Sequence, residues 1–136
     1  MFIYEMDKLF TTIEHTAMKL VLVVEADAKI GPLLVRAIKE ETPYQAFLVT
    51  NAVQALQIAR QIIPDLLLLD YWLPEMDSIA LYELLQGLER LELVPAIFMS
   101  ASTCCLLEDN EQPKGRGLQK PLELDSLLHI IRELLA

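Results

Sequence analysis

The side chains in this sequence that could do chemistry together each follow a short, mostly apolar run, at the point where the run ends. They are Glu25, Asp27, Asp70, Ser100 and Lys120. A carboxylate can act as a nucleophile and become an aspartyl phosphate, and acidic side chains can hold Mg²⁺ through oxygen ligands. A hydroxyl and an ammonium group can both donate to phosphate oxygens. The set therefore suits phosphoryl chemistry, provided that the fold brings its members to one place.

The strongest of these signals is Asp70, within residues 64–78, which read PDLLLLDYWLPEMDS. An unbroken apolar run bounded by prolines predicts a strand that is buried on both faces of a sheet. Asp70 then stands at the carboxyl end of a central strand, where open parallel α/β sheets bind ligands. The simpler interpretation is that Asp70 only ends a strand or caps a turn. Glu75 and Asp77, further along, are expected in a solvated acidic loop.

Short strands alternate with helices along the rest of the chain. Besides the run that ends at Asp70, apolar runs predict strands at residues 20–24, 45–50, 96–99 and 118–119. Helical spacing of apolar residues follows each of the first three strands and the last. The expected apolar faces are Ile30, Leu33, Leu34, Ala37 and Ile38; Ala52, Ala55, Leu56, Ala59 and Ile62; Leu81, Leu84, Leu85 and Leu88; and Leu124, Leu127, Leu128, Ile131, Leu134 and Leu135. Residues 102–117 are interpreted as one short helix and a loop.

This order predicts a parallel sheet with right-handed crossovers, in an α/β fold of five βα units. With the strand order 2-1-3-4-5, the first and third strands are neighbours and a crevice opens between their carboxyl ends. All the candidate side chains then lie along one edge. Asp27 and Asn51 are plausible caps of the helices that begin after them.

Length and composition limit the classes of protein. A chain of 136 residues that is 54% hydrophobic, with a mean hydropathy of +0.36, is expected to form one domain with a well-filled core. Its formal net charge of -9 argues against nucleic-acid binding, and no apolar run reaches the roughly 18 residues of a membrane span. Cys104 and Cys105 are adjacent and form no CxxC motif, which suits a reducing cytosol. There is no convincing signal peptide, so a cytoplasmic location is expected.

Residues 1–17 stand apart from the alternating strands and helices and are expected to form an extension to a domain at residues 18–136. Apolar residues recur in the extension at helical spacing, at Ile3, Met6, Phe10, Ile13 and Ala17. A short amphipathic helix would bury this stripe against the domain or against a second copy of the chain. The alternative is a frayed terminus.

From residue 18 to the end, the sequence resembles the receiver domain of two-component response regulators. The resemblance is carried by VVEAD after the first strand, LLLLDYWLPEMDS around Asp70, FMSAS after the fourth strand and QKP after the fifth. It implies a flavodoxin-like (βα)₅ doubly wound fold. It also implies that Asp70 is the phospho-acceptor, Ser100 the switch hydroxyl and Lys120 the lysine of the site, with a cis peptide before Pro121. Magnesium would be held by Glu25, Asp70 and the backbone carbonyl of Trp72.

Three positions depart from the family pattern. Ala26 stands where the family has a second acid that binds the metal, so weakened Mg²⁺ binding is expected. Asp27, one residue on, is a candidate replacement ligand, with helix capping as the alternative. Gly117 occupies the position of the switch aromatic, and Ser78 that of a glycine.

The resemblance implies a stand-alone signalling domain, of the chemotaxis-regulator type, and not an enzyme beyond its own phosphotransfer and dephosphorylation. Its partners would be a histidine kinase or phosphotransfer protein and an output protein, or a second copy of the chain. No partnership with nucleic acid or membrane is expected. The main alternative is a pseudo-receiver that keeps the fold and binds partners without phosphorylation. Haloacid-dehalogenase phosphatases are disfavoured because Trp72 stands where they need a second Asp, and flavin-binding flavodoxins because the loop EADAKIGP lacks their hydroxyl- and glycine-rich sequence.

Overall fold

A computed structural model describes residues 5–9, 18–88, 91–100, 115–119 and 123–136 of the chain. A sheet of five parallel strands forms its centre, in the order β2-β1-β3-β4-β5. The strands are β1 (Leu20–Val24), β2 (Gln45–Val49), β3 (Leu66–Asp70), β4 (Ala96–Ser100) and β5 (Gly115–Gln119). The predicted strand order is confirmed, and with it the doubly wound α/β architecture.

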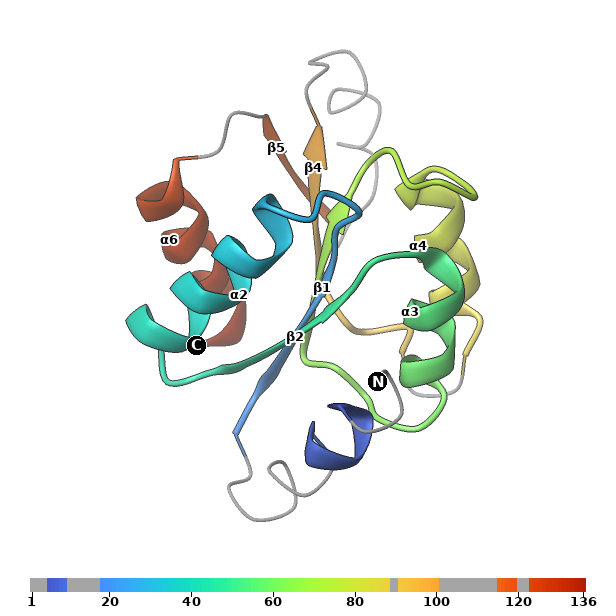
Figure 1. The fold of residues 1–136 in the computed structure, drawn as a ribbon, viewed down its shortest axis with the longest axis horizontal. Helices are drawn as coiled ribbons and strands as arrows, with labels where there is room; N and C mark the ends of the chain where they lie inside the picture. The colour runs from blue at the N-terminus through green and yellow to red at the C-terminus, as the bar shows by residue number, and fades with distance from the viewer. Residues whose placement is uncertain (1–4, 10–17, 89–90, 101–114, 120–122) are drawn as a thin grey trace.

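Helices cover both faces of this sheet (Figure 1). Helices α2 (Ile30–Glu41) and α6 (Leu124–Leu135) pack on one face, while α3 (Ala52–Ala59) and α4 (Ser78–Gln86) pack on the other. The connections from β1 to β2, through α2, and from β3 to β4, through α4, therefore each carry a helix across a face of the sheet, as parallel pairing requires. Among the described helices, none has both the length and the apolar character needed to cross a bilayer.

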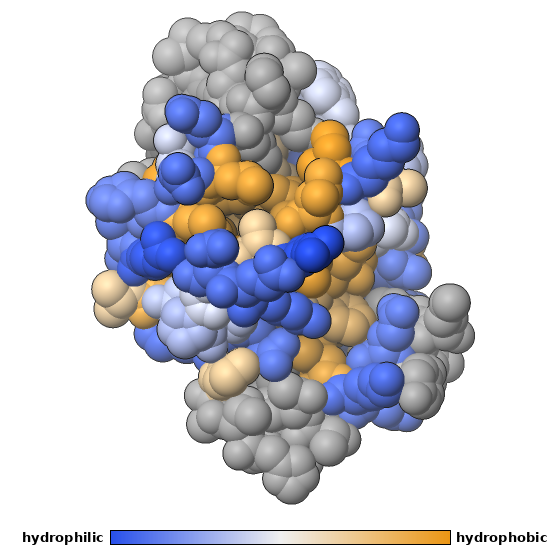
Figure 2. All heavy atoms as spheres, turned by 60° about the vertical axis from the view of Figure 1, so that its left-hand side comes forward, coloured by the Kyte–Doolittle hydropathy of each residue, from blue (hydrophilic) through white to orange (hydrophobic). Residues whose placement is uncertain are grey.

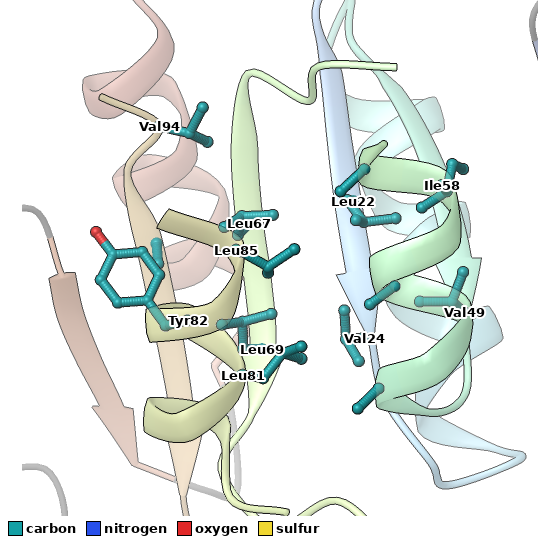
Figure 3. Packing of buried hydrophobic residues seen from close by; sticks show 14 of the residues in the cluster. Leu22, Val24, Val49, Ile58, Leu67, Leu69, Leu81, Tyr82, Leu85 and Val94 are labelled. Atoms are coloured by element: carbon teal, nitrogen blue, oxygen red, sulfur yellow. The ribbon is translucent and has the colours of Figure 1, made fainter. Parts of the chain in front are cut away.

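Strand β3 lies in the middle of the sheet, and all four of its leucines are buried. Leu67 and Leu69 pack in the cluster beneath α3 and α4, where Figure 3 shows them facing Leu81 and Leu85 of α4. Leu66 and Leu68 point to the opposite cluster, beneath α2 and α6. The predicted burial on both faces is confirmed.

Strand β5 is longer than the two residues predicted. It begins at Gly115, and its register pairs Ala96 with Gly115 and Ser100 with Gln119. The two glycines within it have low strand propensity, so the sequence favoured a loop here. Pairing along β4 overrides that local preference. The rest of the segment predicted as one short helix and a loop, residues 102–114, lies outside the described residues, and so do Cys104 and Cys105.

The predicted helix faces are correct in direction but too wide. Leu33 on α2 is 61% exposed, Leu84 on α4 is 50% exposed and Leu124 on α6 is 45% exposed. On α4 the buried stripe instead runs through Leu81, Tyr82 and Leu85. Tyr82 packs edge-to-face on Phe98 of β4, and burial raises the pKa of its hydroxyl above the ordinary value. Counting leucines overestimated the apolar arc because a helix on a sheet buries only one stripe.

Helix α2 approaches the sheet closely because residue 31 has no side chain. A methyl group placed on Gly31 would lie 2.9 Å from Cδ1 of Leu48 on β2. Helix α3 begins as predicted, with the Asn51 side chain accepting a hydrogen bond of 2.9 Å from the amide of Gln54. Gly31 thus leaves room for Leu48 beneath α2, and the Asn51 cap defines the first turn of α3.

A helical turn at residues 5–9 is part of the same hydrophobic core. Met6 and Leu9 are each only 6% exposed and pack in the cluster that contains Leu20, Leu22 and Phe47. Met6 was predicted on the apolar stripe, whereas Leu9 was not. The other four residues of the predicted stripe lie outside the described part of the chain. The described turn contributes apolar contacts to the lower end of the sheet in Figure 1.

Replacing Leu9 with alanine is expected to lower the free energy of unfolding by about 2 kcal/mol, the lower end of the range for buried leucines, because a single turn can partly collapse onto the gap. Urea unfolding measures this. Glu5→Ala, on the exposed side of the same turn, is the matched control and should change stability by less than about 0.5 kcal/mol. Equal stability of Leu9→Ala and Glu5→Ala would show that the turn does not contribute to the folded core in solution.

Candidate functional site

Glu25 and Asp70 lie side by side at the carboxyl edge of the sheet. The register pairs Val24 of β1 with Leu69 of β3, so the next residues along, Glu25 and Asp70, are at the same level on neighbouring strands. Alternation along each strand assigns both side chains to the same face. Glu25 is 1% exposed and Asp70 is 9% exposed. Two buried carboxylate residues thus stand at neighbouring strand ends on one face of the sheet.

Ser100 adds a hydroxyl at the end of β4, the strand on the other side of β3. Asp70 pairs with Met99 of β4, which places Ser100 one residue beyond the level of Asp70, and Ser100 is 1% exposed. The predicted lysine, Lys120, follows the last residue of β5 but lies outside the described residues, as does its bond to Pro121. The fold therefore brings three of the predicted site residues, Glu25, Asp70 and Ser100, to adjacent strand ends.

The turn after β1 is organised by its own acidic side chains. Oδ1 of Asp27 accepts hydrogen bonds from the amides of Lys29, at 2.7 Å, and Ile30, at 3.0 Å. These are the bonds of a helix cap, and they hold the start of α2. Oε2 of Glu25 accepts a hydrogen bond of 3.2 Å from the amide of Asp27. Ala26 is exposed and offers no ligand atom in its side chain.

The loop after Asp70 is closed on itself and tied to β4. The amide of Tyr71 donates to the carbonyl of Met99 at 2.7 Å, and the amide of Ser78 donates to the carbonyl of Tyr71 at 2.8 Å. Trp72 and Asp77 form an antiparallel bridge across the loop. The Trp72 side chain is 62% exposed and touches the ring of Tyr71 edge-on, with the ring centres 4.9 Å apart. The single tryptophan of the chain is therefore an exposed group two residues from Asp70.

Glu75 and Asp77, which were predicted to lie in a solvated acidic loop, each accept a hydrogen bond from the start of a helix. Oδ1 of Asp77 accepts a hydrogen bond of 2.9 Å from the amide of Ala80 and so caps α4. Oε1 of Glu75 accepts one of 3.2 Å from the amide of Ala52, at the start of α3. An acidic residue just before a helical pattern is a cap signal that could have revealed the role of Asp77. Nothing in the sequence pointed to the contact of Glu75, which joins segments 23 residues apart.

The donor atoms here suit a hard cation, but the set is small. Carboxylate oxygens are the ligands that Mg²⁺ prefers, and Mg²⁺ keeps several waters when few protein ligands are present. In the part of the chain that the structure describes, no three or more Asp, Glu, His or Cys side chains are grouped so that they could hold a metal ion. Glu25 and Asp70, with water, fit a weakly held Mg²⁺, and the cap bonds of Asp27 leave it less suited to join them.

Comparisons with known proteins converge on one family. The family model for the response regulator receiver domain matches residues 21–132. The polar-differentiation response regulator DivK of Brucella anthropi is 28% identical over 121 residues, which cover 86% of this chain and 96% of DivK.

Solved structures show the same architecture. The receiver domain of the Francisella response regulator 1452 superposes with a TM-score of 0.76 at 25% identity, over 86% of this chain and 96% of that one. The chemotaxis response regulator CheY4 of Vibrio cholerae superposes with a TM-score of 0.78 at 18% identity, over 87% of this chain and 99% of CheY4, and at this identity it bears on the fold alone.

The two roles considered for Asp27 can be separated by substitution. Asp27→Ala removes the cap bonds and should lower the free energy of unfolding by about 1 kcal/mol, whereas Asp27→Asn keeps a side-chain oxygen for capping and should change it little. If Asp27 is only a cap, the calorimetric Mg²⁺ titration of Asp27→Asn will superimpose on that of the natural protein. Weaker Mg²⁺ binding by Asp27→Asn, at unchanged stability, would instead assign it as a ligand.

Proposed function

Because the chain belongs to the response regulator receiver domain family, we propose that it accepts a phosphoryl group on Asp70 in two-component signal transduction. The observation that supports this most directly is the position of Asp70. It ends the central strand, is almost buried, and has Glu25 and Ser100 at the ends of the strands on either side. Asp70 therefore lies at the edge of the parallel sheet where folds of this kind bind their ligands.

In this proposal an oxygen of the Asp70 carboxylate attacks the phosphorus of a phosphohistidine on the donor. A P–O bond forms as the P–N bond breaks, and the imidazole that leaves takes up a proton. Ser100 donates its hydroxyl to a phosphoryl oxygen, and Lys120, through its ammonium group, donates to another. Glu25 and Asp70, with the backbone carbonyl of Trp72, would hold Mg²⁺, which when bound neutralises charge on the transferring group.

The proposed partners follow from this chemistry. The donor is a histidine kinase or a phosphotransfer protein, and the output passes through contacts with another protein or a second copy of the chain. The formal net charge of -9 is consistent with partners that present basic surfaces. A cytoplasmic location is part of the proposal, since two adjacent cysteines without a disulfide framework suit a reducing compartment.

One observation favours a second candidate function, that of a pseudo-receiver. Ala26 removes a ligand oxygen at the position where the family pattern has an acid, and the described residues contain no cluster of three potential ligands. A domain of this kind would keep the fold and bind partners without being phosphorylated.

The two functions predict different results for labelling with radioactive acetyl phosphate in the presence of Mg²⁺. A receiver should incorporate label that Asp70→Asn abolishes, while Asp125→Asn, which changes an exposed carboxylate on α6, retains it.

Beryllofluoride with Mg²⁺ should alter the fluorescence emission of Trp72 in the natural protein and not in Asp70→Asn. Neither labelling nor an emission change at millimolar Mg²⁺ would favour the pseudo-receiver, and equal labelling of Asp70→Asn would remove Asp70 from the site.

Restoring an acid after Glu25 should strengthen the metal site. Ala26→Asp adds a charged oxygen ligand and is expected to raise Mg²⁺ affinity by about tenfold or more, since even outer-shell changes alter metal affinity by that factor. Ala26→Asn, of nearly the same size but uncharged, is the control and should change affinity less. Tight Mg²⁺ binding by the natural protein that Ala26→Asp leaves unchanged would mean that other groups already complete the site.

A further inference from the structure

Strand β2 forms one edge of the sheet, and its only pairing among the described strands is with β1. The amide of Gln45 donates to the carbonyl of Lys19, and the amide of Glu25 donates to the carbonyl of Val49. In a parallel pair, alternate residues direct both backbone groups to the same neighbour. The odd-numbered residues of β2 therefore bond to β1, and Ala46 and Leu48 direct their N–H and C=O groups outward.

Two adjoining hollows, together called here the β2 groove, run along this edge. One has a volume of about 640 Å³ and is lined by β2, by the turn at residues 5–9, and by Val35 and Lys39 of α2. The other, of about 440 Å³, shares Val35, Lys39 and Leu48 with the first. Ala46 is buried at the floor, while Leu48 is partly exposed. A chain lying in the groove could therefore reach the backbone of Leu48 and pack on Val35.

The charge of the β2 groove is opposite to that of the chain. The whole chain has 20 acidic and 11 basic residues, whereas the groove is lined by three basic residues, Lys8, Arg36 and Lys39, and two acidic ones, Glu5 and Glu40. Arg36 and Glu40 bind each other, at 2.8 Å. On this side of the molecule, Figure 2 shows hydrophobic surface bordered by hydrophilic side chains. The groove thus offers apolar contacts beside a lysine, Lys39, in an otherwise acidic protein.

We propose that the β2 groove binds an extended, acidic segment of a partner protein. The segment would add a strand at the edge of the sheet, with main-chain hydrogen bonds to Leu48, an apolar side chain on Val35 and a carboxylate beside Lys39. This site lies on a different strand from Asp70 and does not depend on phosphorylation. It gives the domain a second surface through which a partner can be held.

A second copy of the chain is a poorer occupant. Two grooves facing each other across a two-fold axis present the same residues to one another, so Lys39 and Lys8 of one copy would meet a surface that is also basic. An exposed sheet edge that lacks a partner is also a liability for self-association, and charged side chains beside the edge oppose it. Both arguments favour an acidic segment of another protein over a second copy of this chain.

Titration of the full chain, labelled with ¹⁵N, tests the proposal. The probe is a capped seven-residue peptide in which valine and glutamate stand two residues apart with threonine between them, so that both side chains point to the face of α2. We expect shifts centred on the amides of Leu48 and Lys39, and slower hydrogen exchange at Leu48. Lys39→Glu should weaken binding between about three- and tenfold, since it turns one surface attraction into a repulsion. Lys29→Glu, an exposed lysine outside the groove, is the matched control.

Two altered peptides separate the contributions. A valine–lysine peptide should bind more weakly than the valine–glutamate one, and so should the glutamate peptide with its strand-facing amides N-methylated. Absence of shifts at Leu48 up to millimolar peptide, or equal binding of the lysine peptide, would overturn the proposal. Self-association would overturn the proposal as well. In that case sedimentation would show a dimer of the free protein, and the same amide signals would shift as the protein concentration rises. None of these results depends on whether Asp70 accepts phosphate.

Discussion

Four leucines in β3 have to leave water on both faces of the sheet at once, because their side chains alternate between two helix layers. Each buried leucine contributes about 1.5–3 kcal/mol of hydrophobic free energy. The strand can satisfy this demand only at the centre of the sheet, with β1 and β4 beside it. Its polar last residue, Asp70, is then carried to the edge where Glu25 and Ser100 also emerge. The position of the site is thus a consequence of core packing.

The parts of the fold that were predictable are those in which one physical effect dominates. Short continuous apolar runs bounded by turn residues indicated buried strands, and the alternation of strands with helices indicated a parallel sheet with crossovers. The predicted strand order put Glu25 and Asp70 at neighbouring strand ends, and the register seen in the structure puts them at the same level. The caps formed by Asn51 and Asp27 were predictable because their bonds are local in sequence.

The features that the sequence did not reveal depend on partners distant in the chain. Leu33 and Leu84 are as apolar as their buried neighbours, and only the direction from which the sheet approaches decides that they stay exposed. Gly115 is in a strand because β4 supplies the pairing, against its own preference. Glu75 reaches the start of α3 across 23 residues, a contact that no spacing rule encodes. The family pattern was equally silent on the burial of Leu9, because this residue precedes the matched residues 21–132.

Asp77 makes two contacts, one with the loop after Asp70 and one with helix α4. Its backbone bridges to Trp72 across the loop after Asp70, and its side chain holds the first turn of α4. One residue thus supports both the loop after Asp70 and the first turn of α4. Leu81 and Tyr82, on the buried side of that helix, pack in the core, where Tyr82 contacts Phe98 of β4. Loss of the Asp77 side chain would therefore remove support from the start of α4 directly beside the loop that follows Asp70.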